Sequence, residues 1–205
     1  MKKNNNFYDL IISRRSIRIF RQKGIPKDIV KKAINSARLS PSAANLQFLE
    51  YLVIRKKSLR DKVFPLTRWA GYIWPRRTPA KGQEPTLYII ILVNRKKSKT
   101  PDLRDIGAAA ENIMLSLLFY GVGSCWLASI DRKALRKTLT IPSNYEIDSL
   151  IAAGFPAESP KLEDDSANIK YWLDNKNILH LPKRPLKSIL HLEKLSVSNS
   201  KSRKK

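Results

Sequence analysis

The hydrophobic pattern is densest at residues 106–130, where Glu111 is the only charged residue. The first part of this stretch, IGAAAENIMLSLLFY, is rich in alanine, leucine and methionine, which favour helix. Its apolar side chains point in nearly every direction around a 3.6-residue turn, which is typical of a buried helix. We therefore expect a central buried helix at residues 106–120. The residues suited to its ends are Asp102 or Asp105 at the amino end and Gly121 and Gly123 at the carboxyl end.

The second part of the stretch decides whether it spans a membrane. The 18 residues from Ile113 carry no charge and reach the length of a membrane-spanning helix. The sequence GVGS at residues 121–124 interrupts this run, because its glycines favour a turn. The following CWLASI, at residues 125–130, is predicted to be a short buried strand that Asp131 ends. We expect a helix and a strand here, and no membrane span.

Shorter periodic segments lie on both sides of this core. Apolar positions three to four residues apart predict helices, and alternating or β-branched apolar runs predict strands. Interleaved helices and strands indicate a mixed α and β class. Residues 64–85 lack a clear period, contain Trp69, Tyr72 and Trp74, and are a candidate lid or binding segment. The predicted helices cover residues 7–13, 26–40, 58–63 and 131–139, and the further predicted strands cover residues 48–54, 86–94 and 149–155.

Length and cysteine content limit the class of protein. The 205 residues are enough for one domain with a sizeable core. We expect a single domain over residues 1–195 and a disordered basic tail at residues 196–205, which has no apolar residue after Val197. The single cysteine, Cys125, excludes an internal disulfide and favours a reducing compartment. Without an apolar run of signal-peptide length at the start, a cytoplasmic protein is expected.

Charge leaves several partners open. The formal net charge is +23, and such a surface attracts anions such as nucleic acid, acidic lipid or a phosphorylated small molecule. A lysine-rich solvated exterior explains the same charge. The charge by itself therefore does not choose between a functional and a purely solubilising role.

The sequence offers little for metal or nucleophilic catalysis. The two histidines, His180 and His191, and Cys125 show no zinc-ligand spacing, and the histidines are best explained as surface or packing residues. No G-x-S-x-G elbow, P-loop or G-x-G-x-x-G motif occurs. We expect no metal ion and no catalytic side chain.

Three polar clusters remain, and they suit anion and amide binding. Arginines beside a serine can grip a phosphate through charge-assisted bonds, and hydroxyl and amide groups can read the polar edge of a planar heterocycle. Taken alone, each cluster is more simply a basic or polar surface turn. The clusters are Arg14, Arg15, Ser16 and Arg18; Ser42, Asn45 and Gln47; and Lys183 and Arg184.

In this order, however, the clusters form part of a larger set of motifs. The set comprises RRSIRIF at residues 14–20, PSAANLQ at 41–47, DIGAAAENIMLSLLFYGVGSCWLASID at 105–131, AAGFPAESP at 152–160 and HLPKRPL at 180–186. The combination resembles the FMN-dependent nitroreductase family over residues 7–192. The resemblance implies an α+β, three-layer fold with a mixed β-sheet, helices on both faces and a central buried helix. It also implies a domain-swapped homodimer whose flavins lie at the subunit interface.

The resemblance further implies a place for each cluster around FMN. It gives no residue the role of nucleophile or general base, because the flavin itself performs the redox chemistry. The implied cofactor-binding residues are Arg14 and Ser16 with Lys183 and Arg184 at the phosphate, Arg15 beside them, Arg18 nearer the ribityl chain and pyrimidine, Pro41, Ser42, Ala43, Asn45 and Gln47 from the partner subunit, and Leu127, Ala128 and Ser129 near the flavin N5.

Three functions follow from these observations. The leading hypothesis is an FMN-dependent oxidoreductase that uses NADH or NADPH to reduce a small-molecule acceptor such as a nitroaromatic or quinone, with ping-pong kinetics. A flavin-binding relative with another redox reaction is the first alternative. A basic nucleic-acid-binding protein is the second, but the chain lacks a recognisable binding motif and its arginines are not on one helix.

Overall fold

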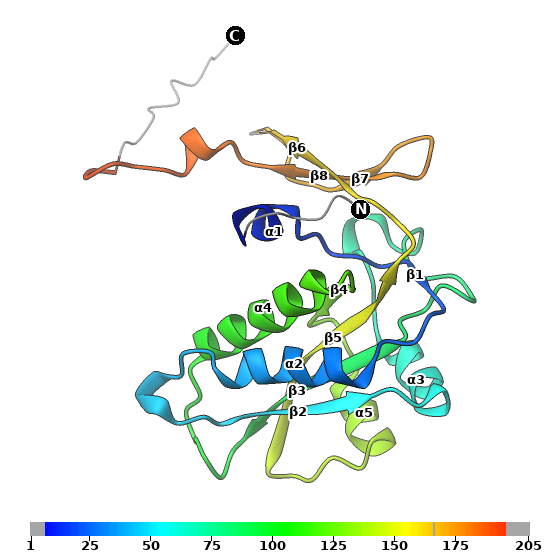
Figure 1. The fold of residues 1–205 in the computed structure, drawn as a ribbon, viewed down its shortest axis with the longest axis vertical. Helices are drawn as coiled ribbons and strands as arrows, with labels where there is room; N and C mark the ends of the chain where they lie inside the picture. Colours follow the sequence, from blue (N-terminus) through cyan, green and yellow to red (C-terminus); the bar gives the residue numbers. More distant parts are fainter. Residues whose placement is uncertain (1–6, 166, 196–205) are drawn as a thin grey trace. The chain divides into compact units, whose positions relative to one another are not determined.

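In the computed structural model, which describes residues 7–165 and 167–195, the apolar run at residues 86–94 forms strand β3 (Leu87–Asn94). All eight of its residues are buried. β3 lies inside a five-stranded sheet, with β2 (Leu49–Ile54) on one side and β5 (Tyr145–Pro156) on the other. The other edge of β5 pairs with β4 (Gly123–Leu127) and with β1 (Phe20–Arg21) (Figure 1).

Every strand pair described in this sheet is antiparallel, whereas a mixed sheet was expected. The position of β5 explains the difference. Helix α4 (Leu103–Phe119) connects β3 to β4, and these two strands run in the same direction, but β5 lies between them and is antiparallel to both. Parallel pairing occurs at an isolated bridge between Ser16 and Ser124, and between β6 (Lys161–Asp164) and β8 (Leu179–Lys183).

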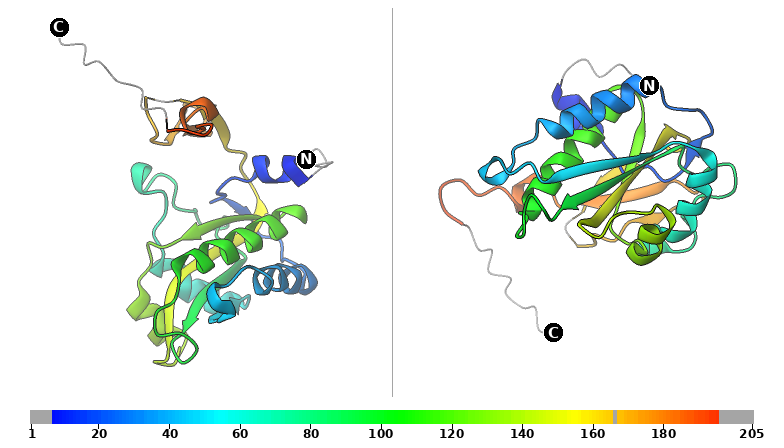
Figure 2. Two further views of the ribbon diagram at one scale, coloured as in Figure 1. Left: turned by 90° about the vertical axis from the view of Figure 1, so that its left-hand side faces the viewer. Right: turned by 90° about the horizontal axis from the view of Figure 1, so that it is seen from below.

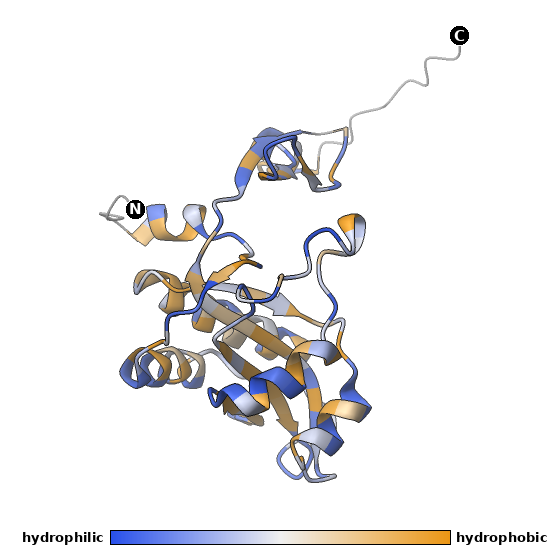
Figure 3. Cartoon of the chain, turned by 90° about the vertical axis from the view of Figure 1, so that its right-hand side faces the viewer, coloured by the Kyte–Doolittle hydropathy of each residue, from blue (hydrophilic) through white to orange (hydrophobic). Residues whose placement is uncertain are grey.

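Both faces of the five-stranded sheet are covered, which confirms the three layers. Odd-numbered residues of β3, such as Ile89, share a core with α2 (Lys27–Arg38) and α4, whereas even-numbered residues, such as Ile90, share a core with α3 (Lys57–Val63) and α5 (Arg132–Thr138). Figure 2 shows these helices on opposite sides of the strands, and Figure 3 shows the hydrophobic strands between them. Because strand side chains alternate between faces, a strand that is apolar at every position requires this arrangement.

Helix α4 is buried on one face only within a single chain. The sequence predicted burial on nearly every side, but Leu103 and Phe119 are 72% and 69% exposed. Asp102 caps the helix by accepting a hydrogen bond from the Arg104 N–H at 2.9 Å, and Gly121 adopts a left-handed φ of 73° after the last turn. The buried stripe consists of Asp105, Ile106, Ala109, Ala110, Ile113, Met114 and Leu117.

The other elements form largely where the apolar periodicity places them. Helix α1 (Phe7–Ser13) has the predicted bounds, and α2, α3 and α5 begin and end within a few residues of theirs. β5 begins at Tyr145, four residues before the predicted start. The sequence analysis missed β1, which has only two residues. Within the described residues, no helix combines the length and the apolar character that crossing a membrane requires.

The chain divides into two compact units, Met1–Pro160 and Lys161–Lys205. The first contains the five-stranded sheet, and the second contains a three-stranded sheet in the order β6-β8-β7, where β7 is Trp172–Leu173. The two units are separate compact parts of the chain, and a single domain over residues 1–195 stays a prediction. The tail expected at residues 196–205 lies outside the described residues.

His180 organises the three-stranded sheet of the second unit. Its ring is buried, stacks on the Trp172 ring with centroids 4.2 Å apart, and lies between two carboxylates. Nδ1 contacts a carboxylate oxygen of Glu163, and Nε2 lies 3.2 Å from Oδ2 of Asp174. The hydrogen bond to Glu163, followed by that to Asp174, raises the pKa of His180 above its ordinary value of 6.5. The expected packing role of this histidine is confirmed.

We predict that the second unit loses stability as the pH rises through the pKa of folded His180. A folded-state pKa above the unfolded value stabilises the fold fully below about pH 6.5, and this contribution disappears at higher pH as the imidazolium deprotonates. NMR titration of the histidine ring protons should give His180 a pKa above 6.5. Glu163→Gln should lower that value by about one unit, whereas Asp164→Asn, which removes the same charge at the neighbouring position, should change it less. A His180 pKa at or below 6.5 in the parent would contradict this assignment.

Candidate functional site

The arginine segment at residues 14–18 lies along the start of β4. Ser16 forms the parallel bridge with Ser124, and the Ile17 N–H donates to the Ser124 carbonyl at 2.9 Å. Gly123 permits this approach, because a Cβ atom there would lie 2.7 Å from Ile17 Cγ1, closer than real contacts allow. The far end of β4 leads directly into residues 127–129. One strand thus connects two of the predicted site segments.

The arginines of this segment have different environments. Arg14 is half-buried, and its Nε lies 3.2 Å from Oε1 of Glu111 on α4. The Arg15 guanidinium donates to the carbonyls of Ile12 and Arg14, both at 2.7 Å, but its buried Nε has no hydrogen-bond partner among the described residues. Burial, and then the charge of Arg14, lower the pKa of Arg15. Arg18 is only 8% exposed, so it is buried more deeply than Arg14 and Arg15.

A buried carboxylate that the sequence analysis missed holds this segment in place. Glu158 Oε1 accepts hydrogen bonds from the backbone N–H groups of Arg18 and, at 3.0 Å, Ile19. Its Oε2 forms an ion pair with Arg77, and both side chains are almost fully buried. Glu158 lies in the motif at residues 152–160, directly after the apolar strand β5. An acidic residue so close to a buried strand could have been recognised in the sequence as a candidate buried carboxylate. Nothing in residues 64–85 identifies Arg77 as its partner.

The loop at residues 41–47 is attached to the first turn of α4. Asp105, which is buried, accepts hydrogen bonds from the Ser42 hydroxyl and from the Ala43 N–H, both at 2.9 Å to Oδ2. The Ser42 oxygen in turn accepts from the Gln47 N–H at 3.1 Å. The φ angles of Ala44, Asn45 and Gln47 lie between 48° and 53°, in the left-handed region. The sequence offered Asp102 or Asp105 as the cap of α4; Asp102 caps the helix, and Asp105 holds the loop.

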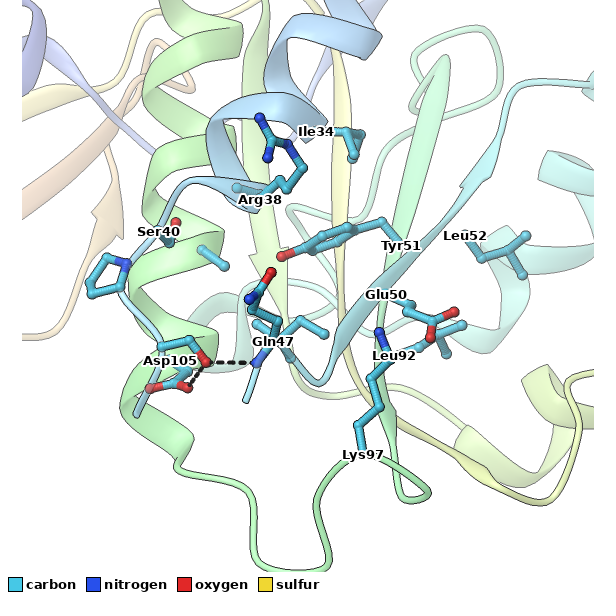
Figure 4. A pocket seen from close by; sticks show the side chains of 15 residues that line it. Ile34, Arg38, Ser40, Gln47, Glu50, Tyr51, Leu52, Leu92, Lys97 and Asp105 are labelled. Atoms are coloured by element: carbon cyan, nitrogen blue, oxygen red, sulfur yellow. Dashed lines mark hydrogen bonds between the residues drawn. The ribbon is translucent and has the colours of Figure 1, made fainter. Parts of the chain in front are cut away.

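A hollow of about 580 Å³ lies beside this loop, between α2 and β2. Figure 4 shows Arg38, Gln47 and Tyr51 around it, together with the hydrogen bonds that join Asp105, Ser42 and Gln47. Burial raises the pKa of Tyr51 to about 12, so its hydroxyl stays protonated at neutral pH. Pro41 and Ser42 line the same hollow, whereas the exposed Ala43 and Asn45 do not.

The segment at residues 127–129 ends β4 and is attached to the irregular segment 64–85. Leu127 is buried, and Ala128 and Ser129 are exposed. The Ala128 carbonyl accepts from the Ile130 N–H at 3.1 Å, and the Ser129 carbonyl accepts from the Arg68 N–H at 3.0 Å. Both carbonyls therefore already accept a hydrogen bond within the chain, and these bonds fix the position of the exposed backbone beyond β4.

Lys183 and Arg184 belong to the second unit. The Lys183 carbonyl accepts from the Asp165 N–H at 2.9 Å, and the Arg184 guanidinium donates to the Ser188 carbonyl at 2.6 Å. Both residues are exposed. The segment at residues 14–18 belongs to the first unit, and the approach of Lys183 and Arg184 to it stays a prediction.

The first unit thus presents cations, fixed backbone and a polar loop, which suit a large anionic ligand. Cys125 lies beside Ser124 but is not a good nucleophile, because burial raises the pKa of its thiol. Two site segments meet along β4, and the third is held at the start of α4.

Comparison with known proteins shows the family of this chain. The chain matches the family model described as the Nitroreductase family over residues 11–155. A relative from Archaeoglobus fulgidus, provisionally named an NADH dehydrogenase/NAD(P)H nitroreductase, is 32% identical over 156 residues, which is 73% of this chain and 84% of that protein. The crystal structure of a provisionally named NADH oxidase from Clostridium acetobutylicum has a TM-score of 0.67 and 26% identity, covering 91% of this chain and 99% of its own.

A third similarity concerns the fold alone. The crystal structure of a provisionally named nitroreductase from Desulfovibrio desulfuricans, in complex with FMN, has a TM-score of 0.67 and 22% identity, covering 94% of this chain and 99% of its own. The family match covers most of the chain and includes the motifs at residues 14–20 and 41–47. This chain belongs to the Nitroreductase family.

Proposed function

We propose that this protein is an FMN-dependent oxidoreductase that uses NADH or NADPH to reduce nitroaromatics, quinones or related small molecules in a ping-pong cycle. The observation that carries the proposal is the attachment of the arginine segment at residues 14–18 to β4, whose far end is the exposed segment 127–129. This attachment gives one site both a phosphate-binding end and a fixed backbone edge. The names of the relatives and the FMN complex of the Desulfovibrio protein support the same reaction class.

The residues present suit FMN. Its phosphate carries a charge near −2 at neutral pH, and Arg14, Arg15 and Ser16 supply two cations and a hydroxyl to meet it. The buried Arg15 Nε, unpaired within the described chain, is a donor available to an acceptor from outside, and leaving such a donor unpaired costs roughly 1–3 kcal/mol. Lys183 and Arg184 would add positive charge at the phosphate.

FMN, when bound, supplies the two-electron chemistry. The task of the chain is then to hold it and to stabilise negative charge beside its ring. Arg18, kept buried by the backbone bonds to Glu158, places a permanent cation near the ribityl and pyrimidine side. The fixed backbone of Leu127, Ala128 and Ser129 borders the region of N5. No side chain is required as a nucleophile or a general base.

We further propose that the site is completed in a domain-swapped homodimer. Helix α1 packs against α4 and exposes Phe7 and Tyr8, about 70% each, and Phe119 at the end of α4 is 69% exposed. Such a continuous apolar surface is typical of an interface. Residues 186–195 of the second unit also expose Leu186, Leu192 and other apolar side chains, as expected of an arm that packs on a partner. Pro41, Ser42, Ala43, Asn45 and Gln47 would then contact the flavin of the other subunit.

Purification provides a direct test of the proposed function. The protein should carry a visible flavin absorption band, sediment at twice the chain mass, and oxidise NADH or NADPH when a nitroaromatic or a quinone is added. A flavin band without turnover of either acceptor would point to another redox reaction within the family. A colourless monomer that cannot be reconstituted with FMN would overturn the proposal.

Substitution of the arginines should separate binding of FMN from its reduction. Arg14→Ala removes a charge-assisted bond worth about 1.5–3 kcal/mol, so it should weaken FMN binding about 10- to 150-fold and lose flavin on dialysis. Arg18→Ala should slow reduction more than it weakens retention, and Arg18→Lys should recover part of the rate. Arg95→Ala breaks an exposed ion pair with Glu146 and an exposed hydrogen bond to the Lys99 carbonyl, and it should change neither quantity. Equal effects of all three alanine substitutions would show a response to total charge instead.

Asp105 should be required for the conformation of the loop at residues 41–47. Its carboxylate holds a loop with three left-handed residues, each costing about 1 kcal/mol or more. We expect Asp105→Asn to raise the Kd for FMN about tenfold by loosening the loop, measured by flavin fluorescence. Asp102→Asn removes the same charge from the same helix end and retains a good cap, so it should change the Kd less than about twofold. Equal effects of the two variants would exclude a specific role for Asp105.

A further inference from the structure

The loop at residues 68–77 begins beside residues 129–130, just beyond the end of β4. Thr67 bridges Ile130, and the Arg68 N–H donates to the Ser129 carbonyl at 3.0 Å. Trp69 is 1% exposed, and its Nε1–H donates to the Thr67 hydroxyl at 2.9 Å. Burial of a tryptophan at the base of a loop fixes the start of that loop in the core.

The same loop ends beside the arginine segment. Arg77 is buried in its ion pair with Glu158, and Glu158 also accepts the backbone N–H groups of Arg18 and Ile19. The two ends of the loop are therefore attached to residues 129–130 and, through Glu158, to residues 18–19. These are the two segments proposed to border the flavin ring, so the loop spans the same site.

Between its fixed ends the loop exposes aromatic and cationic side chains. Tyr72 and Trp74 are 59% and 63% exposed, although large aromatic residues are usually mostly buried. Arg68 and Arg76 are exposed, and among the residues described no side-chain partner is found for either. No acidic residue occurs from residue 64 to residue 83, and Glu158 forms its ion pair with the buried Arg77. Rings and unbalanced cations at neighbouring positions are the chemistry that recognises a planar anion.

We propose that this loop selects redox substrates that carry a negative charge on or near a planar ring. Trp74 and Tyr72 stack on the ring, and Arg68 and Arg76 bind the negative group. The proposal rests on the proposed function and adds the substrate class. Two sources share this chemistry, namely an acidic aromatic acceptor such as a sulfonated quinone, and the adenosine phosphates of NADH or NADPH.

Two sets of rate measurements on the flavin-loaded protein distinguish these sources. The oxidative half-reaction is measured with a sulfonated naphthoquinone and a neutral naphthoquinone, and the reductive half-reaction with NADPH and a neutral N-benzyl dihydronicotinamide. Arg76→Gln and Arg68→Gln should each lower the preference for the charged member of one pair about fivefold to tenfold, as expected for one exposed charge-assisted contact. Trp74→Ala should lower kcat/KM for both members of that pair by a similar factor, because stacking depends little on charge.

Lys31→Gln is the matched control, because it removes one exposed positive charge from α2, on the opposite face of the sheet. It should leave both preferences within about twofold. A change confined to the quinone pair identifies the acceptor as the ligand of the loop, and a change confined to the nicotinamide pair identifies the donor. Preferences that stay unchanged in both Arg68→Gln and Arg76→Gln, or that change equally in Lys31→Gln, would overturn the proposal.

The same measurements distinguish a failure of the proposed oxidoreductase function from a failure of the role proposed for the loop. A parent protein without flavin, or without turnover of the neutral quinone, fails before any preference is measured. A parent that turns over the neutral quinone, with loop variants that keep the parental preferences, refutes only the role of the loop. Flavin content and circular dichroism of each variant show whether it remains folded and loaded.

Discussion

The burial of β3 on both faces is the constraint on which the rest of this fold depends. A strand whose eight residues are all buried needs a neighbouring strand on each edge and a layer of side chains on each face. β2 and β5 supply the edges, α2 and α4 cover one face, and α3, α5 and Trp69 cover the other. The segments that connect these layers must pass around the edges of the sheet, and the candidate site consists of such connecting segments.

The Glu158 carboxylate joins its own segment after β5 to two others, the arginine segment at residues 14–18 and the loop at residues 68–77. A carboxylate removed from water is stable only when donors surround it. Here the donors are the N–H groups of Arg18 and Ile19 and the Arg77 guanidinium, which come from distant parts of the sequence. A buried ion pair contributes little net stability compared with apolar packing, but it specifies which segments meet, because breaking it leaves an unpaired buried charge. We infer that this carboxylate fixes the relative position of the arginine segment and the loop at residues 68–77.

The sequence predicts those features that arise from local periodicity. The strand at residues 86–94, the helix at 106–120 and its cap at Asp102 follow from apolar spacing and capping chemistry, and all are present. The three-stranded sheet of the second unit was missed, since its strands have two to five residues and are too short for a period to stand out. The partners of Glu158 and Asp105 were missed for another reason. A polar residue in the sequence shows that it needs a partner when buried, but only the fold determines which of many donors reaches it.

Helix α4 shows how an almost entirely apolar element can position polar segments. Its buried stripe holds it against the sheet, and three of its polar side chains contact segments outside the helix. Asp105 holds the loop at residues 41–47, Glu111 pairs with Arg14, and Asn112 donates to the Ser40 hydroxyl at 2.8 Å. Asp105 and Glu111 are six residues apart, a rise of about 9 Å along the axis of a helix. The same helix therefore sets the spacing between Arg14, which is proposed to bind the phosphate, and the loop proposed to reach the flavin of the other subunit, although none of its own side chains is proposed to contact the cofactor.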